Sequence, residues 1–95
     1  MKRVDMYLDK IRDKLDGAMD YAEKYISYKT DKPQWSRMYG EMAMDELKHA
    51  EYAKSIAQQY IEGLAWAPEE VMDQWNHCVA HYGEKVALIK LMLSK

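Results

Sequence analysis

The chain has 95 residues, of which 48% are hydrophobic and 32% charged, and its formal net charge is -2. A chain of this length closes one hydrophobic core and has no room for a second, so we expect a single domain over residues 1–95. The 14 basic and 16 acidic residues are mixed along the sequence. This mixture argues against a nucleic-acid groove or a membrane-surface helix, because both concentrate basic charge. We expect neither nucleic acid nor membrane as a partner.

The composition fits a reducing compartment or is indifferent to the redox state of the compartment. The N-terminus has no apolar core of signal-peptide length, and no stretch approaches the roughly 20 apolar residues of a membrane span. The single cysteine, Cys78, excludes a disulfide within the chain. We therefore predict a cytoplasmic protein. A domain this small often completes its core by pairing with another copy, so we expect a homodimer or a higher oligomer, with another protein as the alternative partner.

Breaks in the helical pattern occur at two places, between Thr30 and Pro33 and between Gly63 and Pro68. Pro33 suits the first turn of a helix with Thr30 or Asp31 as its cap, and Gly63 suits the end of that helix. We predict an all-α protein in which two long helices form an antiparallel hairpin and a third packs beside it. The predicted helices span residues 3–29, 33–62 and 68–94.

In the first predicted helix, apolar residues recur at helical spacing and form one face. This face comprises Val4, Tyr7, Leu8, Ile11, Leu15, Ala18, Ala22 and Tyr25. Lys14 and Tyr21 lie at its edge. Gly17 lies inside the helical pattern, as do Gly40 and Gly83 in the later helices, and each costs about 1 kcal/mol of helix stability relative to Ala. We expect these glycines to mark close contacts between helices.

The second predicted helix carries an apolar side that we expect to be buried. It comprises Trp35, Tyr39, Met42, Ala53, Ile56, Ala57 and Tyr60. Glu46 and His49 fall in the middle of this side, although Glu is seldom buried without a partner. Residues three apart on a helix point the same way, so a carboxylate oxygen and an imidazole nitrogen can reach one metal ion. The alternative is a buried hydrogen-bonded pair or salt bridge between the two side chains.

The third predicted helix has an apolar stripe of its own. The stripe comprises Val71, Trp75, Cys78, Val79, Tyr82, Val86, Ile89 and Leu93. Cys78 belongs to it as a small core residue, whereas His77 and His81 lie on the polar side. Their spacing of four residues suits adventitious binding of a divalent ion at the surface, and we do not expect a metal site on this helix.

The run Met44-Asp45-Glu46-Leu47-Lys48-His49-Ala50-Glu51 resembles the second-helix signature of the ferritin-like superfamily, which includes bacterioferritin, rubrerythrin and the short encapsulated ferritins. Leu15-Asp16-Gly17-Ala18 with Tyr21, and the turn after them, is similar to the first helix and loop of the short members. The resemblance implies a half-bundle completed by dimerisation. It also implies iron or zinc between helices, with Glu46 as bridging ligand, His49 as terminal ligand and ferroxidase-like oxidation of Fe(II) by dioxygen.

The chain departs from the family pattern on its first helix. There the family supplies a Glu ligand seven residues before a Tyr, but the position is Lys14 when counted from Tyr21 and Ala18 when counted from Tyr25. One interpretation is that the Lys14 ammonium neutralises Glu46, so that a metal site has become a salt bridge. The other is that two chains bring their Glu46 and His49 side chains together as four metal ligands, as zinc or iron would require. Tyr21 stands where the family keeps a supporting tyrosine beside the metal; the alternative, which we favour, is that Tyr21 is a packing residue.

Two functions follow from these interpretations. The first is a ferritin-like protein that binds iron or another divalent ion at a dimer interface. The second is a metal-free module for helical oligomerisation or protein interaction, derived from a ferritin-like scaffold. The missing carboxylate on the first helix and the many Trp, Tyr and Met residues favour the second function.

Overall fold

The computed structural model describes residues 2–95, most of which belong to three α-helices: α1 (Lys2–Tyr28), α2 (Pro33–Glu62) and α3 (Glu69–Leu93). No strand occurs in this part of the chain. The prediction of an all-α protein with three helices is confirmed. Within residues 2–95, none of the helices combines the length and the apolar composition that crossing a membrane requires.

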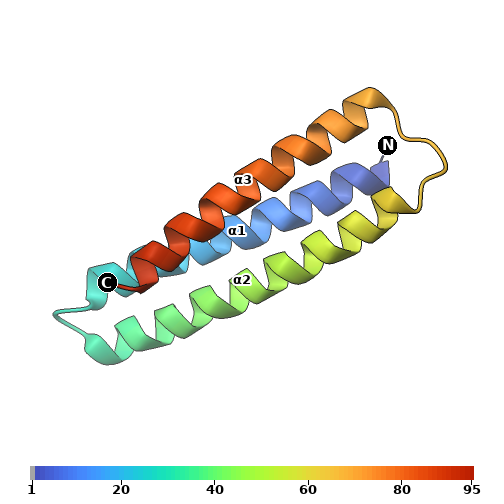
Figure 1. Ribbon diagram of the computed structural model, residues 1–95. Coiled ribbons are helices and arrows are strands. Elements are labelled where there is room, and N and C mark those ends of the chain that lie inside the picture. Colours follow the sequence, from blue (N-terminus) through green and yellow to red (C-terminus); the bar gives the residue numbers. More distant parts are fainter. Residues whose placement is uncertain (1) are drawn as a thin grey trace.

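The three helices form a rod in which α1 is central (Figure 1). α1 packs along both α2 and α3, whereas α2 and α3 barely touch each other. The chain reverses at each connection, so α2 runs antiparallel to α1, and α3 runs parallel to α1 (Figure 1). The rod measures 53 × 16 × 16 Å with a radius of gyration of 15.4 Å. A compact chain of this length has a radius of gyration of about 12 Å, so much of each helix stays at the surface.

The central place of α1 follows from its wide apolar face. Its buried residues recur every three or four positions, which makes one continuous stripe. They are Val4, Leu8, Ile11, Leu15, Ala18 and Ala22. All six belong to the predicted face of the first helix, which is therefore confirmed at these positions. The stripe is broad enough to contact α2 on one flank and α3 on the other.

The predicted buried side of the second helix is only partly buried: Ala53 and Tyr60 pack against the core, and Tyr39 and Met42 are half-buried. The residues of α2 that are buried are Ser36, Ala43, Leu47, Ala50, Ala57 and Ile61. Only Ala57 was expected, while Trp35 remains 49% exposed and Ile56 remains 40% exposed. The buried stripe lies about 90° around the helix from the predicted one, at 100° per residue. Its small side chains let α1 and α2 approach closely, and the large aromatic side chains are left on the flank.

Two of the three helical glycines mark this close approach. A Cβ atom at Gly17 would lie 2.9 Å from Glu46 Oε2, and one at Gly40 would lie 2.9 Å from Cδ1 of Tyr25. Gly83 has no such neighbour within 4 Å. The expectation that glycines mark helix contacts is therefore right for α1 and α2 and wrong for α3.

The turn between α1 and α2 is held without the predicted cap. Lys32 is the N-cap residue of α2 and makes no side-chain cap hydrogen bond, so the expectation for Thr30 or Asp31 is wrong. The backbone N–H of Ser36 donates to the Lys32 carbonyl over 3.0 Å. The Ser36 hydroxyl donates to the Tyr25 carbonyl over 2.6 Å. This buried serine thereby ties the start of α2 to the last turn of α1.

The predicted stripe of α3 faces α1. Val71, Trp75 and Ile89 are buried. The remaining members are partly buried against the same core, namely Cys78, Val79, Tyr82, Val86 and Leu93. α3 packs mainly on α1, and it meets α2 where Lys54 Nζ lies 5.2 Å from the Tyr82 ring centroid. The flank of α2 that carries the large aromatic residues receives no cover from α3.

Candidate functional site

α1 and α2 share a long side that faces away from α3, which we call the outer face. On α1 this face includes Lys10. Arg12 borders α3, and Lys10 lies about 160° around the helix from it, on the side away from α3. On α2 it coincides with the side that the sequence predicts to be buried. The outer face comprises Met6, Tyr7, Lys10, Lys14, Gly17, Tyr21, Lys24 and Tyr28 of α1, with Trp35, Met38, Tyr39, Met42, Glu46, His49, Tyr52, Ala53, Ile56 and Tyr60 of α2.

Three of the four candidate site residues meet at the middle of this face. Lys14 Nζ lies 3.6 Å from Glu46 Oε1, and His49 Nδ1 lies 2.9 Å from the same oxygen. The Glu46 side chain is 20% exposed and that of His49 is 57% exposed. The carboxylate lies over Gly17, whose missing Cβ leaves room for it. Glu46 is therefore at the edge of the α1 contact, while His49 is at the surface of the chain.

The hydrogen bond fixes the role of each ring nitrogen of His49. A carboxylate only accepts, so Nδ1 carries the proton that is donated to Glu46. Nε2 is then the ring nitrogen that is left for another partner. A carboxylate on one ring nitrogen is the arrangement that orients histidines for binding a metal through the other.

Within one chain, these residues do not fit a ferritin-like metal centre. The position from which the first helix would offer a carboxylate holds the Lys14 ammonium, 3.6 Å from Glu46 Oε1. An ammonium at that distance repels a metal cation. It also neutralises the negative charge of the Glu46 carboxylate, which would otherwise attract the cation. Across residues 2–95, the structure gathers no three His, Cys, Asp or Glu side chains into a group that could hold a metal ion.

Tyr21, the fourth candidate residue, belongs to a row of aromatic rings at one end of the outer face. Its ring stacks on Tyr39 with centroids 6.0 Å apart, and Tyr39 stacks on Tyr28 at 5.7 Å. Trp35 is the last ring of the row, and its centroid lies 5.6 Å from that of Tyr28 in an edge-to-face contact. Lys24 Nζ lies 5.4 Å from the Tyr39 ring centroid, in a cation–π contact. The sequence did not predict this row, although the seven-residue spacing of Tyr21 and Tyr28 is a sign of it.

The other end of the outer face is an apolar groove of about 440 Å³ between α1 and α2. Met6, Tyr52 and Ile56 line it and are exposed, Tyr52 by as much as 72%. Tyr7, also on its wall, packs against Tyr60 with ring centroids 5.3 Å apart. The outer face thus has an apolar region at each end and the Lys14, Glu46 and His49 group between them.

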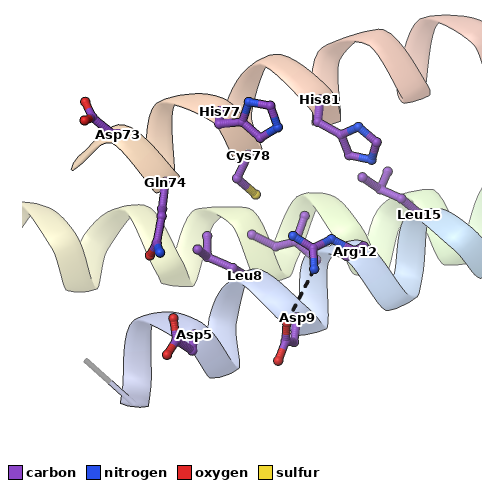
Figure 2. Close-up of a pocket in the computed structure, with 11 residues that line it drawn as sticks. Asp5, Leu8, Asp9, Arg12, Leu15, Asp73, Gln74, His77, Cys78 and His81 are labelled. Carbon is purple, nitrogen blue, oxygen red and sulfur yellow. Dashed lines mark ion pairs between the residues drawn. The ribbon is translucent and has the colours of Figure 1, made fainter. Parts of the chain in front are cut away.

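A second groove, of about 710 Å³, lies between α1 and α3 (Figure 2). His77, Cys78 and His81 line it from α3, and Asp9 and Arg12 line it from α1 (Figure 2). Arg12 Nη1 lies 3.6 Å from Asp9 Oδ1, so the guanidinium is already paired. The polar side assigned to His77 and His81 is thus the wall of a groove. Cys78 is half-buried in it, as its place in the apolar stripe predicts.

Two side chains of α3 have raised pKa values, which favours their neutral forms. Burial raises the pKa of the Cys78 thiol, and the positive charges of Arg12 and Lys54 offset only part of that rise. Burial also raises the pKa of the Tyr82 hydroxyl, and the negative charge of Glu51 adds to the effect. Because a thiolate is the reactive form of cysteine, the raised pKa lowers the reactivity of Cys78 near neutral pH.

Comparison of the chain with protein-family models, with curated proteins and with solved structures gives no match. The likeness to the ferritin-like superfamily therefore remains a resemblance over about residues 8–62, specific in the segment around Glu46 and His49 and loose elsewhere. Any argument about function rests on the contacts and the exposure of the outer face.

Proposed function

We propose that this chain is a metal-free helical interaction module, derived from a ferritin-like scaffold, that acts through the outer face of α1 and α2. The contact between Lys14 and Glu46 carries the proposal. It supplies, within the chain, the positive charge that a metal ion supplies to the corresponding carboxylate in the ferritin-like pattern. The chain then keeps the scaffold and its interaction surface without the metal.

The same contact makes the outer face suitable for burial. When a partner covers this face, water leaves the Glu46 carboxylate, and an unpaired buried carboxylate is strongly unfavourable. Lys14 and His49 already contact Glu46 Oε1 at 3.6 Å and 2.9 Å. The charged centre can therefore enter an interface without recruiting another cation. The apolar regions on either side of it supply the favourable free energy of association.

Binding of iron, zinc or another divalent ion where two copies meet is the second candidate function. The observation that favours it is the unshared Nε2 of His49 at the surface, with Nδ1 held by Glu46. Two copies would contribute two imidazoles and two carboxylates, a ligand set that suits zinc or iron. Lys14 opposes this function because its ammonium lies beside Glu46 Oε1.

Metal analysis separates the two candidates. For protein purified without chelator, we expect substoichiometric iron and zinc, and the Glu46→Ala variant should give the same content. Added Zn²⁺, Fe²⁺ or Mn²⁺ should shift the unfolding temperature of the natural chain no more than that of Glu46→Ala, because a ligand stabilises a protein only by binding its folded state and any surface binding at His77 and His81 is common to both. Stoichiometric metal that is lost in Glu46→Ala would contradict the proposal and establish the second candidate.

A further inference from the structure

We propose that the outer face receives an acidic amphipathic helix of another protein, whose apolar stripe enters the apolar groove and whose acidic flank lies over α1. This inference rests on the proposed interaction module and names the chemistry of its partner. The sign of the charges on the face, their position on α1 and the groove between the two helices carry it.

The charged side chains of the outer face are mostly cationic. The face carries Lys10, Lys14 and Lys24, and its one carboxylate is Glu46. Lys14 Nζ lies 3.6 Å from Glu46 Oε1. Lys24 Nζ lies 3.4 Å from Oδ2 of Asp20, which lies further around α1 and outside the face. Lys10 forms no ion pair with any of the described residues. A surface with an excess of cations attracts an acidic partner and disfavours a basic one.

The lysines and the large apolar side chains of the face lie on different helices. All three lysines belong to α1, whereas most of the large exposed apolar residues belong to α2, namely Trp35, Met38, Tyr52 and Ile56. A partner that matches this arrangement has acidic residues along one flank and apolar residues beside them. A helix presents such flanks at fixed spacing while its own backbone groups stay paired. The helical backbones of α1 and α2 offer no free edge to an extended strand.

The apolar groove gives the stripe of the partner a place to insert. The groove has a volume of about 440 Å³, its walls come from both helices, and none of the described residues that line it is Asp or Glu. A groove between two helices accepts the ridge of a third, with apolar anchors at i, i+3, i+4 and i+7. Met6 on the wall is unbranched and adapts to different anchors. A carboxylate next to an anchor would meet Lys10 or Lys14, which line the α1 side of the groove.

The length of the face sets the length of the partner. Tyr52 in the groove and Trp35 in the aromatic row are both exposed, and the difference between their numbers is 52 − 35 = 17 positions on α2. At about 1.5 Å per residue this separation is about 26 Å. A partner helix of about 18 residues therefore reaches from the groove to the aromatic row.

Two other occupants match the face less well. A second copy would bring its own Lys10, Lys14 and Lys24 into the interface, and like charges that face each other oppose association. A nucleic acid would pair its phosphates with the lysines but would leave the exposed Met6 and Ile56 side chains of the groove without an apolar partner.

Selection from a phage-displayed peptide library tests the partner. The library consists of helices of about 18 residues with leucines fixed at the i, i+3, i+4 and i+7 anchors and with Glu, Gln or Lys at the flanking positions. The bait is the natural chain, in chelator. We expect the bound peptides to be enriched in Glu over Lys. Enrichment in Lys, no preference between the two, or the absence of any bound peptide would overturn the inference.

Fluorescence anisotropy with the selected acidic peptide locates the contact. Lys10→Glu should weaken binding by about tenfold, and added salt should reduce this difference because it screens the attraction. Lys90→Glu is the matched control, since Lys90 is an exposed lysine of α3 outside the outer face. Tyr52→Ala should also weaken binding by about tenfold, whereas Leu91→Ala, at an exposed leucine of α3, should leave it unchanged. All variants should keep the helical circular dichroism of the natural chain.

The outcomes separate the partner from the interaction module. Equal weakening by Lys10→Glu and Lys90→Glu would overturn the acidic partner, because the outer face would then have no special role. Displacement of the peptide by an equal concentration of oligothymidylate, or a natural chain that is a dimer by sedimentation equilibrium and binds peptide only after dissociation, would also overturn it and leave the module in place. A natural chain that holds stoichiometric metal and still selects acidic peptides would support the partner and contradict the metal-free module.

Discussion

Replacing Ile11 with Ala is expected to lower the free energy of unfolding by about 2–5 kcal/mol, the cost of removing a large aliphatic side chain from a packed core. Ile11 is fully buried, and it lies on α1, the helix that packs along both α2 and α3. The cavity would therefore weaken both contacts at once. A domain of this kind has a total stability of about 5–15 kcal/mol, so the loss should be a large part of it. Urea unfolding followed by circular dichroism, at one protein concentration, measures the change.

Ile26→Ala is the control for this prediction, because it removes the same atoms from an exposed position on the same helix. We expect it to cost well under about 1 kcal/mol, as surface substitutions usually do. Equal losses in the two variants would mean that Ile11 is no more deeply packed than the exposed Ile26.

Replacing Lys14 with Glu should create metal-dependent stability that the natural chain lacks. The variant removes the ammonium beside Glu46 and puts a carboxylate in its place, next to His49. In chelator, repulsion between the two carboxylates should lower the unfolding temperature. A divalent ion should then stabilise the folded state by mass action, by about 2.7 kcal/mol at 100 times its dissociation constant. Thermal unfolding with EDTA, Zn²⁺ or Mn²⁺ measures both effects.

Lys10→Glu is the matched control for the metal prediction. Lys10 lines the same side of α1 as Lys14, so the substitution changes the charge of the outer face by the same amount. It leaves the contact between Lys14 and Glu46 intact, and we expect no more stabilisation by metal than in the natural chain. If Lys10→Glu responds to metal as strongly as Lys14→Glu does, position 14 does not correspond to the missing ligand.

The sequence was sufficient to predict the helices and the buried face of α1. Proline and glycine at the breaks set the limits of the helices. α1 carries one broad apolar stripe, so the sequence allows only that face of α1 to be buried. α2 carries two apolar stripes about 90° apart. One consists largely of Ala and Leu, and the other consists of large residues such as Trp35 and Ile56. Hydrophobicity favours the larger residues, whereas a close helix pair needs the smaller ones, and the position of α1 decides between them.

The centre of the candidate site could be predicted from the sequence because Lys14 lies seven residues before Tyr21, where the resemblance to the ferritin-like pattern implies a ligand. Its contact with Glu46 is then a consequence of two helices that run side by side. The aromatic row is different, because its rings come alternately from α1 and α2 and meet only when the register of the two helices is known. Tyr21 accordingly lies against Tyr39, a contact that its position in the family pattern does not predict.

Hydroxyl-radical footprinting of the natural chain at low and high concentration of the selected acidic peptide tests most directly whether the outer face is an interaction surface. Tyr52 and Trp35 lie at opposite ends of the outer face, and Trp66 is an exposed ring in the loop between α2 and α3. If the peptide covers the outer face, labelling of Tyr52 and Trp35 should fall together as its concentration rises, while labelling of Trp66 stays constant. Labelling of all three side chains that is independent of peptide concentration would contradict the account.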